Sequence, residues 1–166
     1  MIKYRKGQMI EEVLKYGMVL FFAMIVVIRG YRFMASMEKK ACESEIAKLE
    51  LDMKNIEKNV RKGETELRKY KVPCNADKVY IFDLKKSIDL SLFEKIPIIK
   101  DSLETSSNNV FLIKNGKVLD AFYTGELEID SPYYICFSTS GTLGFFVEGK
   151  AKSVRVASQP EQKLCS

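Results

Sequence analysis

Histidine is absent from this chain of 166 residues, and its four cysteines form no CxxC pair. Without histidine there is no Ser–His or Cys–His nucleophile, no HExxH motif and no mixed Cys/His zinc site. The phosphate-binding patterns GxxxxGK[ST] and GxGxxG are also missing. We therefore predict that the chain is not an enzyme, and that it has no catalytic residues, no cofactor and no metal site.

A concentrated basic region is lacking too. The net charge is +5, but the 27 Lys and Arg residues are spread along the chain, with no basic tail and no basic patch interleaved with aromatic residues. This distribution argues against nucleic acid as a partner and favours a solvated surface. The length allows one modest globular domain with extensions.

Apolar residues are instead concentrated near the N-terminus. The uncharged run Tyr16–Ile28 has 13 residues, or about 20 Å of helix, against a hydrocarbon core of ~30 Å. A helical span of residues 13–35 is long enough to cross this core if Lys15, Arg29 and Arg32 extend their side chains to the membrane surfaces. The run is followed by Arg-Gly-Tyr-Arg and not by a small-x-small cleavage site, so we predict a retained single-pass helix in the lipid bilayer.

The residues before and within this run form a recognisable pattern. Lys6-Gly7-Gln8 precedes Glu12, the fifth residue after Gly7, and Tyr16-Gly17 lies inside the apolar part. This pattern resembles the class III signal peptide of archaeal type IV pilin-like proteins. The chain departs from the family at Glu11, an additional acid, and at Lys15, where the family is usually apolar.

The resemblance implies that a prepilin peptidase removes residues 1–7 by cutting between Gly7 and Gln8. It also implies a cytoplasmic N-terminus and an extracellular head at the cell membrane, because the charges flanking the run give only a weak bias. In the family, the residue matching Glu12 neutralises the free amino terminus of a neighbouring subunit. The alternative is that Glu12 lies in the headgroup layer near a helix N-terminus, where the macrodipole favours acids.

The segment after the membrane predicts a long helix. Residues 36–71 contain no proline and one glycine, so one continuous helix from about Gln8 to Tyr70 is expected, with its transmembrane part at 8–35 and a coiled-coil-like stalk at 36–71. Apolar residues recur along it at heptad spacing. The seam residues are Cys42, Ile46, Leu49, Met53, Ile56, Val60 and Leu67. Such a seam suits a homodimeric coiled coil, or packing on the chain's own head or on filament neighbours.

Beyond Val72-Pro73, which is expected to end the helix, the pattern changes to short strands. Asn115-Gly116 supplies the residues of a type I′ hairpin turn, and Leu90–Glu94 predicts a short helical turn stopped by Pro97. The expected strands are Val79–Phe82, Asn109–Ile113, Lys117–Tyr123, Pro132–Ser138, Leu143–Val147 and Ser153–Ala157. The predicted fold class is α+β, with a small antiparallel β-sandwich-like head at 72–157 and a polar tail at 158–166.

The alternating residues of these strands predict the core of the head. Its expected members are Val79, Ile81, Val110, Leu112, Leu119, Phe122, Ile135, Phe137, Phe145, Val147, Val154 and Val156.

Four cysteines allow three complete pairings, or none at all if the thiols stay reduced. We favour a disulfide between Cys74 and Cys136, because both lie in or beside predicted strands of the same domain. Cys42 lies on the seam, where a parallel dimer would bring it near its mate. Cys165 is either a tether or part of a frayed end.

Two functions of different class follow. The first is a pilin-like (pseudopilin) surface structural protein, held by its N-terminal helix and assembling with itself, as a dimer or filament, or with other pilin-like subunits. The alternative is an uncleaved bitopic membrane protein with a dimerising stalk and a head that binds an unknown ligand. Three acids on one face of the segment 126–130 suit either a hard cation or, as we favour, a solvated surface.

Overall fold

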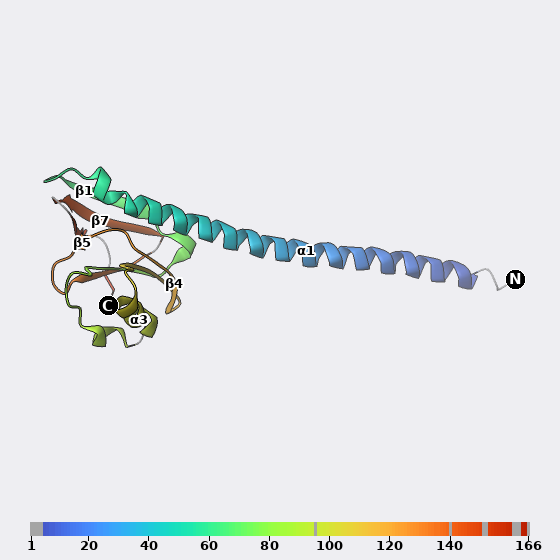
Figure 1. Cartoon of the computed structure of the whole chain (residues 1–166). Helices are drawn as coiled ribbons and strands as arrows, with labels where there is room; N and C mark the ends of the chain where they lie inside the picture. The colour runs from blue at the N-terminus through green and yellow to red at the C-terminus, as the bar shows by residue number, and fades with distance from the viewer. Residues whose placement is uncertain (1–4, 95, 140, 151–152, 161–163, 166) are drawn as a thin grey trace. The chain divides into compact units, whose positions relative to one another are not determined.

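The computed structural model describes residues 5–94, 96–139, 141–150, 153–160 and 164–165, with residues 5–11 and 57 described by their backbone alone. The chain divides into two compact units, Met1–Ala41 and Cys42–Ser166. It is an α+β protein with one long apolar N-terminal helix and two small, mainly antiparallel sheets (Figure 1). The elements are α1 (Arg5–Lys54), α2 (Ile56–Asn59), β1 (Thr65–Lys71), η1 (Pro73–Asn75), β2 (Lys78–Phe82), η2 (Leu90–Phe93), α3 (Pro97–Thr105), β3 (Val110–Lys114), β4 (Lys117–Phe122), β5 (Leu127–Glu128), β6 (Tyr134–Ser138), β7 (Thr142–Gly149) and β8 (Val154–Ser158).

The first unit is the N-terminal part of α1. Its side chains from Glu12 onward are exposed, including the large apolar ones between Val13 (69% exposed) and Met37 (56% exposed). The region from Glu12 contains an 18-residue window of mean hydropathy 1.9, none of which is buried within the protein. Among the described residues, α1 is the one helix that is long and apolar enough to cross a membrane.

The prediction of a continuous helix to Tyr70 is wrong beyond Lys54. Helix α1 ends there, α2 adds one short turn, and the chain then reverses at Gly63, whose φ of +80° suits glycine. The rest of the predicted stalk, Thr65–Lys71, is strand β1. Leu67, the last residue of the predicted seam, is therefore on a strand and 40% exposed.

The second unit holds two four-stranded sheets, with strand orders β1-β7-β8-β5 and β4-β3-β2-β6. The strand pairs are antiparallel except for β5 with β8. The first sheet includes two strands, β1 and β5, that the sequence pattern did not predict. The six strands that the sequence predicts are confirmed as β2, β3, β4, β6, β7 and β8. The predicted hairpin of β3 and β4 is also confirmed, and its turn residues Asn115 and Gly116 both have positive φ.

Strands β2 and β3 are buried on both faces, which explains why they have continuous apolar sequences. Val79 and Ile81 point into one apolar cluster, whereas Tyr80 and Phe82 point into another. The first cluster contains residues of both sheets and of the helices α1 and α2. All twelve residues predicted for the core belong to it or pack against it.

The second cluster contains a helix that the sequence pattern did not predict. The short turn at Leu90–Phe93 is confirmed, but Pro97 does not simply stop it, because Pro97 opens α3 from a position near the helix start that tolerates proline. Phe93 and Ile99 anchor η2 and α3 against the aromatic rings of β2 and β3.

Of the two alternatives for Cys165, a tether or a frayed end, the structure has the tether. Ser158 still belongs to β8, and Leu164 forms a β-bridge with Phe137. A disulfide joins Cys165 to Cys136, and the Cys165 backbone N–H donates to the Cys136 carbonyl at 3.0 Å. The disulfide and the backbone hydrogen bonds together hold residues 164–165 against β6.

Candidate functional site

Two features of the chain are candidates for function: the exposed apolar part of α1, and the surface of the Cys42–Ser166 unit around the end of the same helix. The predicted processing residues Gly7 and Gln8 lie within α1, but their side chains are outside the described residues, as are residues 1–4 altogether. Glu12 is described and exposed on the helix, at the start of the apolar run. The helix thus places the Glu12 carboxylate four residues before the uncharged run Tyr16–Ile28, with Lys15 between them.

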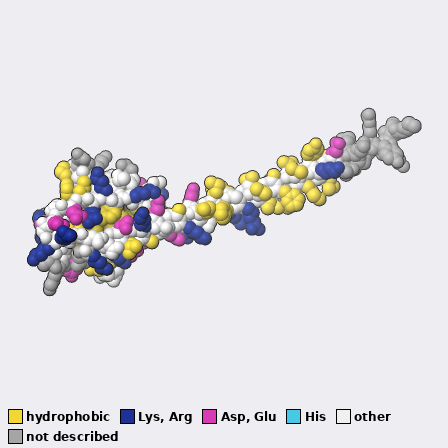
Figure 2. All heavy atoms as spheres, turned by 90° about the horizontal axis from the view of Figure 1, so that it is seen from above, with side chains coloured by type: hydrophobic (Ala, Val, Ile, Leu, Met, Phe, Trp, Pro, Cys, Tyr) yellow, Lys and Arg dark blue, Asp and Glu magenta, His cyan; other side chains and the backbone are white. Residues whose placement is uncertain are grey.

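The apolar surface is visible as a largely hydrophobic stretch of the helix in Figure 2. Phe21, Phe22 and Met24 are each more than 60% exposed, and Leu20 and Val26 reach 70%. A soluble helix normally places such residues against a core, because burying one large apolar side chain is worth about 1.5–3 kcal/mol. The N-terminal part of α1 is therefore a candidate membrane-spanning segment by its length and composition.

The last turns of α1 have a different environment. Leu49 and Met53 are 3% and 1% exposed, and both lie in the first apolar cluster with Ile56 and Val60. Ile46 packs against the same cluster. These seam residues therefore pack on the chain's own head, which is one of the alternatives that the heptad spacing allows. The side chains of Leu49, Met53, Ile56 and Val60 are thus buried within one chain, which argues against a dimeric coiled coil through these residues.

The predicted disulfide between Cys74 and Cys136 is wrong. Cys74 pairs with Cys42, at a Cα–Cα distance of 5.1 Å, and Cys136 pairs with Cys165 at 5.4 Å. The sequence favours Cys74 and Cys136 as a pair because both lie in or beside predicted strands of the same domain, whereas Cys42 lies on the predicted helix seam. Since the end of α1 packs on the head, Cys42 lies beside Cys74 and no intermolecular bond at Cys42 is needed.

Glu45 strengthens the same junction one turn after Cys42. Its carboxylate accepts from the Lys71 ammonium at 2.6 Å and from the Cys74 backbone N–H at 3.2 Å. The hydrogen bond from Lys71, followed by that from Cys74, lowers the pKa of Glu45 below its ordinary 4.5. A carboxylate and a disulfide thus fasten the same turn of α1 to η1 and β1.

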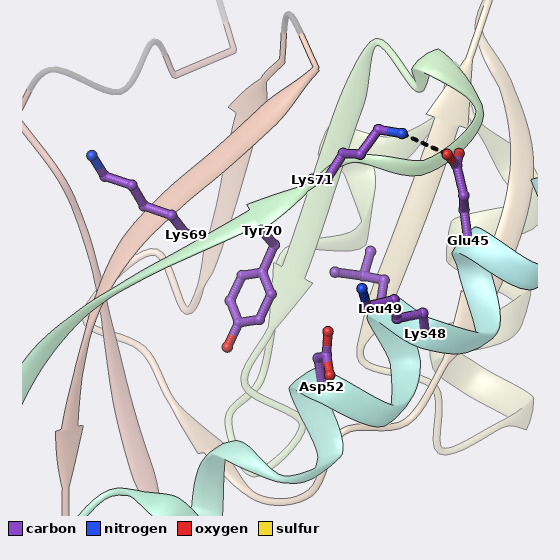
Figure 3. Close-up of a pocket in the computed structure, with 7 residues that line it drawn as sticks. All are labelled: Glu45, Lys48, Leu49, Asp52, Lys69, Tyr70 and Lys71. Atoms are coloured by element: carbon purple, nitrogen blue, oxygen red, sulfur yellow. Dashed lines mark hydrogen bonds and ion pairs between the residues drawn. The ribbon is translucent and has the colours of Figure 1, made fainter.

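Glu45 also lines a cavity of about 330 Å³ between the end of α1 and β1 (Figure 3). Tyr70 of β1 and Asp52 of α1 both line it, whereas the Lys69 side chain points away from them. The ring of Tyr70 stacks on Phe145 at 5.5 Å between centroids, and burial raises the pKa of its hydroxyl to about 12. The cavity has both a cationic and an acidic rim, so its charge favours neither anions nor cations.

The acidic segment 126–130 does not form a cation site. Glu126 accepts from Lys85, and Glu128 accepts from Lys150 and Ser153, each at 2.5 Å. Asp130 pairs with Arg155 at 2.6 Å. These partners neutralise the carboxylates one by one, and the hydrogen bond with Lys150 is the main reason why the pKa of Glu128 is lowered.

These ion pairs border a second cavity, of about 580 Å³, which includes Asp83 and Tyr133. Asp83 is only 1% exposed, and its carboxylate accepts from the backbone N–H groups of Lys85 at 3.0 Å and Ile129 at 3.4 Å. Asp83 therefore holds two loops together and is already occupied with that structural role. Within the described part of the chain, no three His, Cys, Asp or Glu side chains are grouped so that they could hold a metal ion.

Comparison of the chain with models of protein families, with curated proteins and with solved structures finds no match. The sequence pattern identified the apolar helix but missed the junction built by Glu45, Lys71 and the Cys42–Cys74 disulfide. No spacing rule signals a junction whose members are 26 to 32 residues apart.

Proposed function

We propose that this chain is a membrane-anchored, pilin-like surface protein. The N-terminal part of α1 spans the membrane once, and the Cys42–Ser166 unit is its extracellular head. The observation that carries the proposal is the exposed apolar surface of α1, in which an 18-residue window has no buried residue. A lipid bilayer supplies the apolar environment that this surface lacks in the chain itself.

The disulfides support the placement of the head outside the cell. All four cysteines are paired, and both bonds lie in the Cys42–Ser166 unit. Disulfides form and persist in oxidising compartments and are rare in the cytosol. The N-terminus then lies on the cytoplasmic side, where a prepilin peptidase removes residues 1–7 by cutting after Gly7.

We further propose that the head is a β-sandwich in which the two sheets share one core. The first apolar cluster supports this arrangement, because it takes residues from β2, β3 and β6 of one sheet and from β7 and β8 of the other. The end of α1 contributes Leu49 and Met53 to the same core.

The head acts in this proposal as a structural and not a catalytic unit. Its conspicuous charged groups are engaged with each other, as in Glu128 with Lys150 and Asp130 with Arg155. The protein's partners are the bilayer, the peptidase, and copies of itself or other pilin-like subunits. The alternative, an uncleaved bitopic protein with a binding head, retains the anchor and differs at residues 1–7.

A topology experiment tests the anchor and the placement of the head. Whole cells expressing the full chain are treated with an external protease, and the membrane fraction is then extracted with alkaline carbonate. We expect the chain to resist carbonate extraction and the head to be cleaved in intact cells. Release by carbonate would contradict the membrane anchor, and a protected head in intact cells would contradict the extracellular placement.

A further inference from the structure

A basic ridge follows the apolar run on α1. It consists of Arg29, Arg32, Lys39 and Lys40, all of them exposed. At about 100° per residue, the four side chains fall within an arc of roughly 100° of the helix circumference, and they extend over about 16 Å of its length. Figure 2 shows clusters of dark blue side chains on the helix beyond its hydrophobic stretch. Glu38, the acid within this segment, lies about 150° around the helix from the middle of the ridge, whereas Glu43, the next acid along the chain, falls within the arc of the ridge about one turn beyond Lys39 and Lys40.

The position of the ridge relative to the bilayer follows from helix geometry. From Lys15 to Arg32 the helix rises about 26 Å, which is close to the ~30 Å of the hydrocarbon core once both stems extend outward. Arg29 and Arg32 therefore reach the headgroup layer on the side where the apolar run ends. Lys39 lies about 10 Å further along the helix.

The direction of helical side chains brings the lysines back toward the membrane. In an α-helix the Cα–Cβ bonds tilt toward the N-terminus, and long side chains lie over the preceding turn. For Lys39 and Lys40 the preceding turn is the one nearer the bilayer. The stems of Lys39 and Lys40 therefore lean toward the same leaflet that Arg29 and Arg32 reach.

Membrane orientation does not explain these cations. Lys and Arg that direct insertion are enriched on the cytoplasmic side, whereas the proposed orientation places this ridge on the outer side. Tyr31 lies between the two arginines, and Phe33 follows Arg32. These side chains are 76% and 66% exposed, and aromatic residues are commonly found at membrane interfaces. The segment combines interfacial aromatic rings with a one-sided basic face.

We propose that Arg29, Arg32, Lys39 and Lys40 form a binding surface for the phosphates of anionic phospholipids in the leaflet next to the head. The inference rests on the proposed membrane anchor and adds a lipid preference to it. Arginine binds a phosphate through two parallel hydrogen bonds and lysine acts as a point charge, so the ridge suits several headgroups at once. Each cation near an anionic surface increases binding about fivefold.

The test measures which lipids the full chain retains. The chain is reconstituted in vesicles of equal parts phosphatidylglycerol and phosphatidylcholine, extracted in mild detergent, and analysed by native mass spectrometry. We expect phosphatidylglycerol to exceed phosphatidylcholine among retained lipids by at least about fivefold. The variant R29Q/R32Q/K39Q/K40Q should retain both lipids equally. The matched control K58Q/K62Q/K100Q/K117Q removes four exposed head lysines and should keep the preference.

A second variant, K39Q/K40Q, leaves both arginines at the edge of the apolar run and separates lipid binding from insertion. We expect it to insert like the unmodified chain and to lose at least about fivefold in preference. Equal retention of the two lipids by the unmodified chain, or an unchanged preference in K39Q/K40Q, would overturn the proposal. Loss of the preference on adding soluble glycerol phosphate would also overturn it, because the surface would then be a site for free phosphate. A chain that does not enter the vesicles at all would instead contradict the membrane anchor.

Discussion

Replacing Leu49 by alanine tests whether the end of α1 is part of the core of the head. Leu49 is 3% exposed within the first apolar cluster, so Leu49→Ala removes buried methyl groups and leaves a cavity. Buried Leu→Ala changes cost about 2–5 kcal/mol of the free energy of unfolding. Leu51, two residues further on the same helix, is 60% exposed. Leu51→Ala is thus a matched control, with an expected change within about 0.5 kcal/mol.

The assay is urea unfolding of the full chain in detergent. Tyrosine fluorescence is the signal, because the chain has eight tyrosines and no tryptophan. A loss of about 3 kcal/mol in Leu49→Ala corresponds to a melting temperature lower by roughly 6–12 °C for a chain of this size. Similar losses in the two variants would refute the packing of the helix end on the head. A loss that depends on protein concentration would instead identify a second copy as the partner of Leu49.

Three further changes test the junction and the anchor. Replacing Cys42 and Cys74 together by serine should lower the free energy of unfolding by about 3–4 kcal/mol, because this disulfide closes a loop of over 30 residues; an unchanged urea midpoint would contradict that role. Since the folded pKa of Glu45 lies below its ordinary 4.5, the stabilisation from its contacts is complete above pH 4.5 and lost as the pH falls through the folded pKa. The stability difference between the unmodified chain and Glu45→Gln should therefore shrink on acidification, and a difference that grows would refute the assignment. Glu12→Ala should leave the chain in the membrane but prevent its association with other subunits in crosslinking experiments, whereas the uncleaved-anchor alternative expects no effect.

The sequence predicted the head better than the junction. Strand alternation and the Asn115-Gly116 turn depend on neighbouring residues, so local pattern was enough to identify six strands and twelve core residues. The polar-looking segment Thr65–Lys71 is a strand because it pairs with β7, and that pairing involves residues more than 70 positions away. Local helix propensity favoured the wrong structure there.

The heptad spacing from Cys42 to Val60 illustrates a different limit. Regular apolar spacing shows that one face of a helix is buried, but it does not identify what covers that face. Here the cover is the chain's own core, as the burial of Leu49 and Met53 shows. The error in the disulfides has a related cause, because local spacing places Cys42 on a helix seam and does not show that this part of the helix lies beside Cys74.

The sequence likewise predicts one part of the candidate site and misses another. The apolar run of α1 is a property of composition and is visible in the sequence. The neutralisation of Glu126, Glu128 and Asp130 depends on Lys85, Lys150 and Arg155, which other loops and strands bring into place. Such pairs cannot be read from spacing, because their partners lie 22 to 41 residues apart.

The intact mass of the chain extracted from membranes of cells with a prepilin peptidase tests the central claim most directly. The account predicts a mass that lacks residues 1–7 and is lower by a further four hydrogens, two for each disulfide, before reduction. A chain that keeps Met1 in such cells would contradict the pilin-like function and leave the uncleaved anchor. A mass without the loss of four hydrogens would contradict the placement of the head in an oxidising compartment.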